Sequence, residues 1–225
     1  MKRCMIVAAV LAAVLIGFTG CPNPAGKADD NPPSVTPSTP CPLIAGKTYN
    51  VGSTLSVYAP AMKLDLAKGQ PNEGEKFKPL VESAFVTADS DGKVMLTVRF
   101  RKSYVKVGSL ESNKFIDPRN STPGYYDTDG TKKDAEFTLS AAGDTAIPPV
   151  ADPDRKKGVR YVTSMTFPIT KDKSEYLLWI YINSSVMGVQ FCDGANLDGA
   201  GSGEPNKSTK YVGKITVDWD TLRER

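Results

Sequence analysis

The chain has 225 residues and nearly balanced charge, with 28 Lys and Arg against 25 Asp and Glu and no long block of either sign. This balance argues against nucleic acid as a partner. Histidine is absent, which removes the commonest general base, zinc ligand and haem ligand together. Because the sequence also lacks a nucleophile elbow, a phosphate-binding loop and a zinc-ligand spacing, we expect a protein that is not an enzyme.

The chain begins with a pattern typical of secretory signals. Lys2 and Arg3 precede an apolar run over residues 5–18, which ends just before Cys21. This order resembles a bacterial lipobox, in which the signal is cut before the cysteine and the thiol takes a diacylglycerol. We expect a signal peptide at residues 1–20 and an acylated Cys21 that holds the protein on a bacterial membrane surface. An ordinary cleaved signal or an uncleaved anchor is the alternative.

A proline-rich segment follows the signal, at residues 21–43. Its composition favours an extended tether, because it offers too little apolar area to offset the entropy of ordering. Once Cys21 carries lipid, Cys41 and Cys192 are the two thiols left in an oxidising compartment, which predicts a disulfide between them. Two unpaired cysteines are the alternative.

The rest of the chain, residues 44–225, reads as one β-rich domain. Apolar residues alternate with polar ones in four segments, which are residues 49–57, 94–101, 161–167 and 211–219. Such alternation predicts half-buried strands, and residues 89–92 read as a hairpin turn with Gly92 at the position of positive φ.

Two further segments complete the expected fold. Residues 175–183 are apolar on both faces, which predicts a central strand. Residues 62–68 allow one or two helical turns. The sequence therefore predicts an all-β, immunoglobulin-like sandwich of about seven to nine strands, with a short helix after the first strand. We expect long loops at residues 111–134, 141–158 and 193–210, where binding surfaces are usual.

The strand order carries a family resemblance. The segment 161–169 is followed by the strand 176–183, then by Val186-Met187-Gly188, a Gly-rich loop and residues 214–219, which end in Val-Asp-Trp. This order resembles the last strands of a NEAT (near-iron-transporter) domain. Residues 49–57, then Pro60-Ala61-Met62, then the Asp91-Gly92 hairpin are similar to the opening of that family. The resemblance spans most of residues 47–220 and rests on short motifs.

The resemblance implies an immunoglobulin-like sandwich that binds haem or a haemoprotein at a bacterial surface. In many members, the first tyrosine of a Tyr-x-x-x-Tyr pair on the last hairpin ligates the iron, and this chain lacks that pair. Some relatives use two methionines instead, in the places that Met62 and Met187 occupy here. The resemblance thus implies Met62 and Met187 as iron ligands, with Tyr58 and Tyr181 as the next candidates. The alternative is that both methionines fill gaps in the core.

Two functions from different classes follow from these expectations. The first is a surface lipoprotein that captures haem and passes it to a protein partner. The second is an adhesin or interaction module that uses the same sandwich and long loops without a cofactor. In both cases the lipobox and the tether imply an outer-membrane or cell-surface location.

Overall fold

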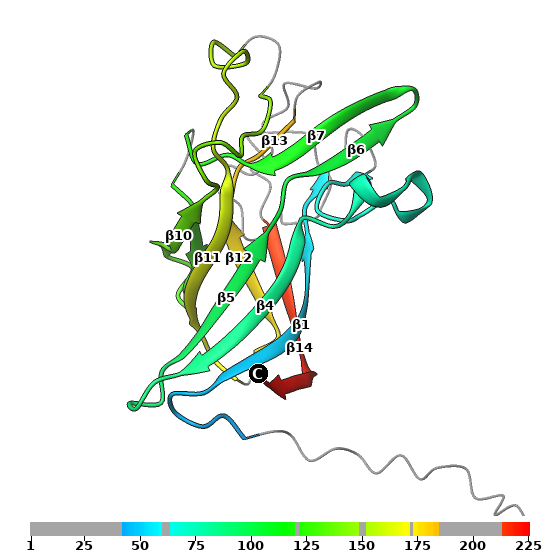
Figure 1. The fold of residues 1–225 in the computed structure, drawn as a ribbon. Helices are drawn as coiled ribbons and strands as arrows, with labels where there is room; N and C mark the ends of the chain where they lie inside the picture. The colour runs from blue at the N-terminus through cyan, green and yellow to red at the C-terminus, as the bar shows by residue number, and fades with distance from the viewer. Residues whose placement is uncertain (1–41, 60–63, 120–121, 149–151, 172, 185–212) are drawn as a thin grey trace, which may run out of the picture. The chain divides into compact units, whose positions relative to one another are not determined.

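The computed structural model describes residues 42–59, 64–119, 122–148, 152–171, 173–184 and 213–225. Nine strands form one antiparallel sheet in the order β10-β11-β5-β4-β1-β14-β12-β8-β9, which is nearly closed into a barrel (Figure 1). These strands are β1 (Thr48–Ser56), β4 (Val81–Ala88), β5 (Val94–Phe100), β8 (Gly124–Tyr126), β9 (Lys132–Asp134), β10 (Glu136–Leu139), β11 (Val162–Ile169), β12 (Glu175–Trp179) and β14 (Gly213–Glu224).

The barrel interior is a packed apolar core. Along β5, Leu96 and Val98 are fully buried, whereas Thr97 and Arg99 between them are not. Side chains of a strand alternate between its two faces, so each strand sends every second residue inward. Three inward aromatic rings contact one another: Phe167 stacks on Tyr125 at 5.4 Å between ring centroids and meets Tyr176 edge-on at 6.2 Å. The described interior is therefore filled by side chains.

One bent chain segment brings the two edges of the sheet together. β9 pairs with β8 and β10 pairs with β11, and only Ala135 separates β9 from β10. The Ala135 amide donates to the carbonyl of Pro123, at 3.1 Å, which extends the pairing with β8 up to the bend. A bend in one chain segment thus brings the sheet close to a closed barrel.

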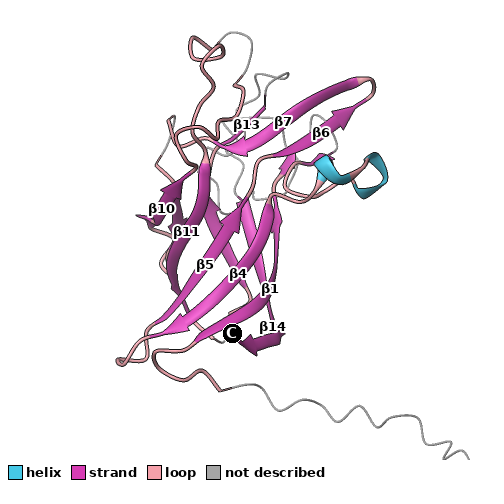
Figure 2. Ribbon diagram, viewed as in Figure 1, coloured by secondary structure: helices cyan, strands magenta, loops and turns pink. Residues whose placement is uncertain are grey.

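A second sheet of three strands, in the order β13-β7-β6, covers one end of the barrel (Figures 1 and 2). It contains β6 (Ser103–Val107), β7 (Leu110–Ile116) and β13 (Ile182–Ser184). Ile116 and Ile182 belong to the barrel core, whereas Phe115 packs in a separate cluster with Ala146 and Tyr161. This sheet, which we call the cap, therefore lies between the barrel core and the outer segment 140–161.

The described chain begins at the end of the barrel away from the cap (Figure 1). Near that start, the Gly46 amide donates to the Ala88 carbonyl at the β4–β5 turn, and the Arg225 amide donates to the Thr48 carbonyl, both at 2.9 Å.

A short hairpin follows β1 at the cap end, formed by β2 (Tyr58–Ala59) and β3 (Leu64–Asp65). Two 3-10 turns come next, η2 (Pro71–Glu73) and η3 (Glu75–Phe77), and Figure 2 shows them beside β6.

The structure confirms the all-β class and differs from the expected sandwich. Instead of two packed sheets, the main strands belong to a single curled one, because β14 pairs with β1 on one side and with β12 on the other. The expected hairpin at 89–92 is confirmed, with Gly92 at φ 79°. The expected helix over 62–68 is wrong for its described part, because β3 forms there and pairs with β2.

Two expectations about segments along the chain are also corrected. Residues 111–134 are not a long loop, since they contain most of β7 together with β8 and β9. The apolar segment 175–183 is not one strand, because it changes sheets after Trp179 and continues as β13. Both faces of this segment are apolar because one half lines the barrel and the other half lies within the cap. The loop expected at 193–210 lies outside the described residues.

Tyr176 fixes the turn between β11 and β12. Its buried hydroxyl accepts from the Thr170 amide at 3.2 Å and lies 2.5 Å from the Thr170 carbonyl and 2.7 Å from the Lys173 carbonyl. We expect Tyr176→Phe to lower the free energy of unfolding in urea by about 1 kcal/mol, because it removes a hydroxyl that bonds to the backbone of Thr170 and Lys173.

The control for this substitution is Tyr104→Phe. The Tyr104 ring also packs edge-on against another aromatic ring, that of Phe77 at 6.3 Å. Its hydroxyl makes no hydrogen bond with the part of the chain that the structure describes. Equal losses of stability in the two variants would contradict the role given to the Tyr176 hydroxyl.

Candidate functional site

Most of the residues expected at a site lie outside the described residues. These are the proposed iron ligands Met62 and Met187, the acylation site Cys21, and the expected disulfide partners Cys41 and Cys192. The expectations on all five therefore stand as they were made from the sequence.

The two candidate tyrosines belong to different elements. Tyr58 lies in β2, where it pairs with Asp65 of β3. Tyr181 lies in the connection between β12 and β13 and is buried at 6% exposure. Its carbonyl accepts from the Asp117 amide at 2.8 Å, which ties this connection to the end of β7.

A cavity of about 490 Å³ opens beside the segment that follows β3. It is lined by Lys68, Gly69, Gly74, Glu75, Phe77, Lys78 and Pro79. The Phe77 ring is buried and supplies an apolar wall. The lysines are exposed and each forms an ion pair, a long one between Lys68 and Asp65 at 3.8 Å and a close one between Lys78 and Glu75 at 2.5 Å. Cavities of this size commonly hold small ligands.

A buried lysine supports the wall of this cavity from the cap. Lys114 of β7 is completely buried, and its ammonium donates to the Lys68 carbonyl at 2.6 Å. Burial lowers the pKa of Lys114 to about 8, against an opposing effect of the Asp65 charge. Asp65 is itself held by the Ser56 hydroxyl at 2.6 Å and by the Val57 amide at 2.9 Å. The cap and the cavity are thus connected through one desolvated amine.

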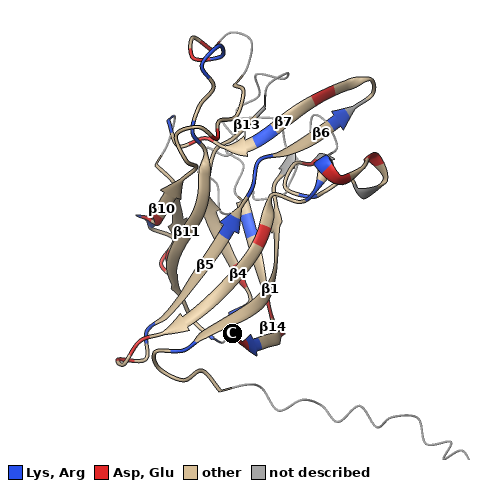
Figure 3. Cartoon of the chain, viewed as in Figure 1, with Lys and Arg blue, Asp and Glu red and all other residues tan. Residues whose placement is uncertain are grey.

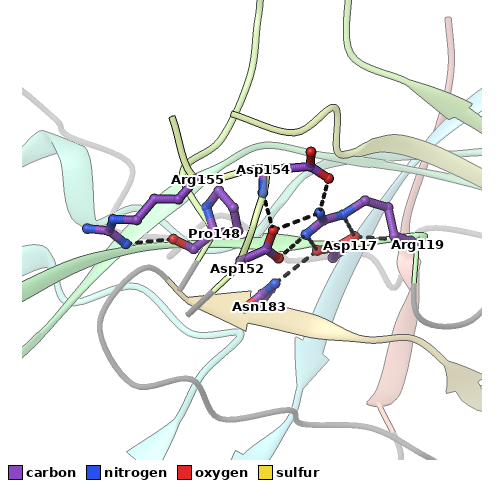
Figure 4. A network of polar contacts seen from close by, with 7 residues as sticks. All are labelled: Asp117, Arg119, Pro148, Asp152, Asp154, Arg155 and Asn183. Atoms are coloured by element: carbon purple, nitrogen blue, oxygen red, sulfur yellow. Dashed lines mark hydrogen bonds and ion pairs between the residues drawn. The ribbon is translucent and has the colours of Figure 1, made fainter. Parts of the chain in front are cut away.

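Four charged residues meet above the cap (Figure 4). Arg119 forms a two-pronged pair with Asp117, with N–O distances of 3.0 and 2.7 Å. It also contacts Asp152 at 2.8 Å and Asp154 at 3.0 Å. Asp117 is fully buried and accepts a further bond from the side-chain amide of Asn183 on β13, at 2.9 Å. We call these five residues the arginine knot.

The arginine knot joins segments that are distant in the sequence. It links the end of β7, the outer segment 152–154 and β13. Hydrogen bonding to Asp117 raises the pKa of Arg119, which therefore stays charged. Hydrogen bonding from Arg119 lowers the pKa of Asp152. Since one guanidinium bonds to all three carboxylates and so ties these segments together, we interpret the knot as structural.

An aromatic cluster lies on the outer face of the barrel. Trp179 of β12 and Tyr126 of β8 have ring centroids 6.1 Å apart, and the Lys132 ammonium lies 4.6 Å from the Trp179 ring centroid. Both rings are partly exposed. Gly124 lies opposite Trp179 in the strand pairing, which leaves room for the indole. A Cβ atom at Gly124 would come within 2.4 Å of the Lys133 carbonyl, so glycine is required there.

A cleft of about 90 Å³ adjoins this cluster. It is lined by Tyr125, Tyr126, Asp127, Thr128, Pro168, Ile169, Thr170, Lys173 and Tyr176. The cleft lies in the barrel wall where β8 faces the end of β11, beyond the last pair of β10 with β11, Glu136 with Thr166. Pro168 has no N–H to offer to another strand, so this edge of β11 is poorly suited to pairing.

Residues of one charge do not form a patch along the chain, because Lys and Arg are interspersed with Asp and Glu (Figure 3). Among the described residues, no group of three or more Cys, Asp or Glu side chains is placed to hold a metal ion. Within the same ranges, none of the helices has the length and hydrophobicity needed to cross a bilayer.

The comparisons with known proteins leave the family open. No protein family, no curated protein and no solved structure matches the chain. The NEAT resemblance therefore rests on the sequence motifs alone.

Sequence reasoning missed Lys114, the arginine knot and the aromatic cluster. Lys114 lies in the segment 111–134 that was expected to be a long loop, and nothing local marks it as buried. The knot joins residues more than thirty positions apart, such as Arg119 and Asp152. Only the Tyr125-Tyr126 pair carried a signal, because two aromatic residues among polar ones indicate a binding surface.

Proposed function

We propose that the protein is a lipid-anchored, extracytoplasmic protein that binds haem or a haemoprotein at the cap end of its barrel. The observation that carries the proposal is the cavity of about 490 Å³ beside β3. In the sequence, Met62 comes just before β3 and within six residues of Lys68 on the cavity wall. The described chain starts at the end of the barrel away from the cap, so the proposed anchor on Cys21 precedes the end of the barrel opposite the proposed site.

The lining of the cavity suits the chemistry of haem. Pro79 offers exposed apolar surface for the porphyrin, over the buried Phe77 ring, and Lys68 and Lys78 offer ammonium groups for its two propionates. Thioether sulfur from Met62 and Met187 is a competent ligand for haem iron. Because a thioether is a neutral, soft donor, such a site favours ferrous iron and suits transient holding and transfer.

Titration of the purified chain with hemin tests the proposal. We expect a saturable change in the visible spectrum that weakens in Met62→Ala and in Met187→Ala. Lys68→Glu should also weaken binding, because it places a carboxylate where a propionate would lie. Met95→Ala is the matched control, since Met95 lies on β5 and should leave the spectrum unchanged.

Two other outcomes are informative. No saturable spectral change would end the haem assignment and favour the adhesin or interaction module without a cofactor. A saturable change of the same size in both methionine variants would support haem binding but exclude Met62 and Met187 as ligands. Tyr58 and Tyr181 would then be tested in the same way.

A further inference from the structure

We propose that the outer wall of the barrel at Tyr126 and Trp179 binds a neutral oligosaccharide, with the adjoining cleft as a subsite for a ring substituent. This site is separate from the proposed haem cavity, which is lined by residues 68–79. The aromatic cluster and the cleft share Tyr126 and so form one continuous surface across β8 and β12.

The two rings have the chemistry that recognises sugar rings. The C–H groups on one face of a pyranose carry partial positive charge and pack on the negative face of an aromatic ring. Trp179 points outward because its neighbour Leu178 is fully buried in the core. Tyr126 points outward because Tyr125 turns inward onto Phe167. The wall therefore presents two rings at 58° to one another. Because the Lys132 ammonium lies over the Trp179 ring, a sugar would pack on Tyr126 and on the part of the indole that Lys132 leaves exposed.

The cleft supplies polar groups around the rings. Asp127, Thr128, Thr170 and Lys173 offer acceptors and donors along its rim. A small-molecule site usually combines apolar surface with a few polar groups, and these polar groups fix the orientation of the ligand. At about 90 Å³ the cleft is too small to enclose a sugar ring. We therefore assign it to a hydroxymethyl group or a similar substituent.

The charges around this surface favour an uncharged glycan. Lys132 lies 3.8 Å from Asp134, and Lys214 on the neighbouring β14 pairs with Glu175 at 2.7 Å. The cleft itself carries one lysine and one aspartate, Lys173 and Asp127. An acidic polysaccharide would meet as many carboxylates as ammonium groups, so it would gain no net electrostatic attraction. The binding of a neutral polysaccharide does not depend on such attraction.

The test is isothermal titration of the full chain with cellohexaose, maltohexaose and chitohexaose. The detergent must carry no sugar, because an alkyl glycoside would compete for the surface. We expect at least one of the three to bind saturably. Trp179→Ala and Tyr126→Ala should each weaken that binding by about tenfold or more, the equivalent of about 1.4 kcal/mol.

Phe85→Ala is the matched control. Phe85 is also a partly exposed aromatic residue with cationic neighbours, Arg99 at 5.3 Å and Arg225 at 4.7 Å from its ring centroid. It lies on β4, which β1, β14 and β12 separate from β8 in the sheet. The control should bind as the unchanged chain does.

Three results would overturn the proposal: no saturable binding of any of the three oligosaccharides, binding that ignores both aromatic substitutions, or an equal loss in Phe85→Ala. Haem binding is measured by the visible spectrum and oligosaccharide binding by the heat of titration. Failure of one proposal is therefore distinguishable from failure of the other.

Discussion

Replacing Arg119 by methionine is expected to lower the free energy of unfolding by about 3–5 kcal/mol, the usual cost of leaving a buried charge unpaired. Asp117 is fully buried, and without the guanidinium it keeps only its bonds from Asn183 and backbone groups. Asp152 and Asp154 would then repel it across the space that Arg119 occupied. Urea unfolding at neutral pH measures the loss.

Two companion variants separate charge from geometry in the arginine knot. Arg119→Lys keeps the charge but cannot form the two-pronged bond, so it should lose part of the stability. Adding Asp117→Asn to Arg119→Met should recover part of it, since the buried charge is removed with its partner. A loss below about 0.5 kcal/mol in Arg119→Met would contradict the structural role of the knot.

The arginine knot also predicts that the stability of the fold depends on pH in the acidic range. Arg119 lowers the pKa of Asp152 in the folded state, so this carboxylate stabilises the fold above its unfolded pKa. That contribution is lost as the pH falls through the folded pKa. The difference in stability between the unchanged chain and Arg119→Met should therefore shrink in acid.

Lys114→Met is expected to remove a rise in stability that the unchanged chain shows in alkali. The folded pKa of Lys114 is about 8 against an ordinary value of 10.5, so between these values the unfolded state binds more protons. Stability then increases with pH across this window, by up to about 3 kcal/mol at 1.36 kcal/mol per unit. Below pH 8 the full cost of burying the ammonium is present.

The measurement compares urea unfolding of the two chains from pH 7.5 to 10.5, so that other titrating groups cancel in the difference. Lys93→Met is the control, because Lys93 lies exposed after the β4–β5 turn. It should leave the pH profile unchanged. A profile that is parallel in Lys114→Met and the unchanged chain would show that the amine does not titrate with a lowered pKa.

Local patterns in the sequence predicted those strands that have one face in the core and one in solvent. In β5 and β11 the alternation is clear because the barrel presents only one face of each strand to its interior. β7 has no such alternation, and its polar residues Ser112 and Asn113 are buried. It lies between the barrel core and the outer segment 140–161, so both of its faces are covered.

Closure and the candidate surfaces depend on pairings between distant residues, which local patterns do not contain. The bend at Ala135 is visible only once β8 and β11 are in place on either side. Similarly, Tyr126 and Trp179 meet because β8 pairs with β12, more than fifty positions away in the chain. Sequence reasoning found Tyr126 as part of a polar loop and Trp179 as part of a core strand, and had no means of joining them.

The position of β14 has a consequence for the order in which the sheet can form. β14 comes last in sequence among the described strands, and it pairs with β1 on one side and β12 on the other. Until it emerges, β12, β8 and β9 connect to β1 only the long way round the barrel, through the bend at Ala135. Contacts between residues so far apart form slowly. We therefore expect the nine-strand sheet to stay incomplete until β14 has been made.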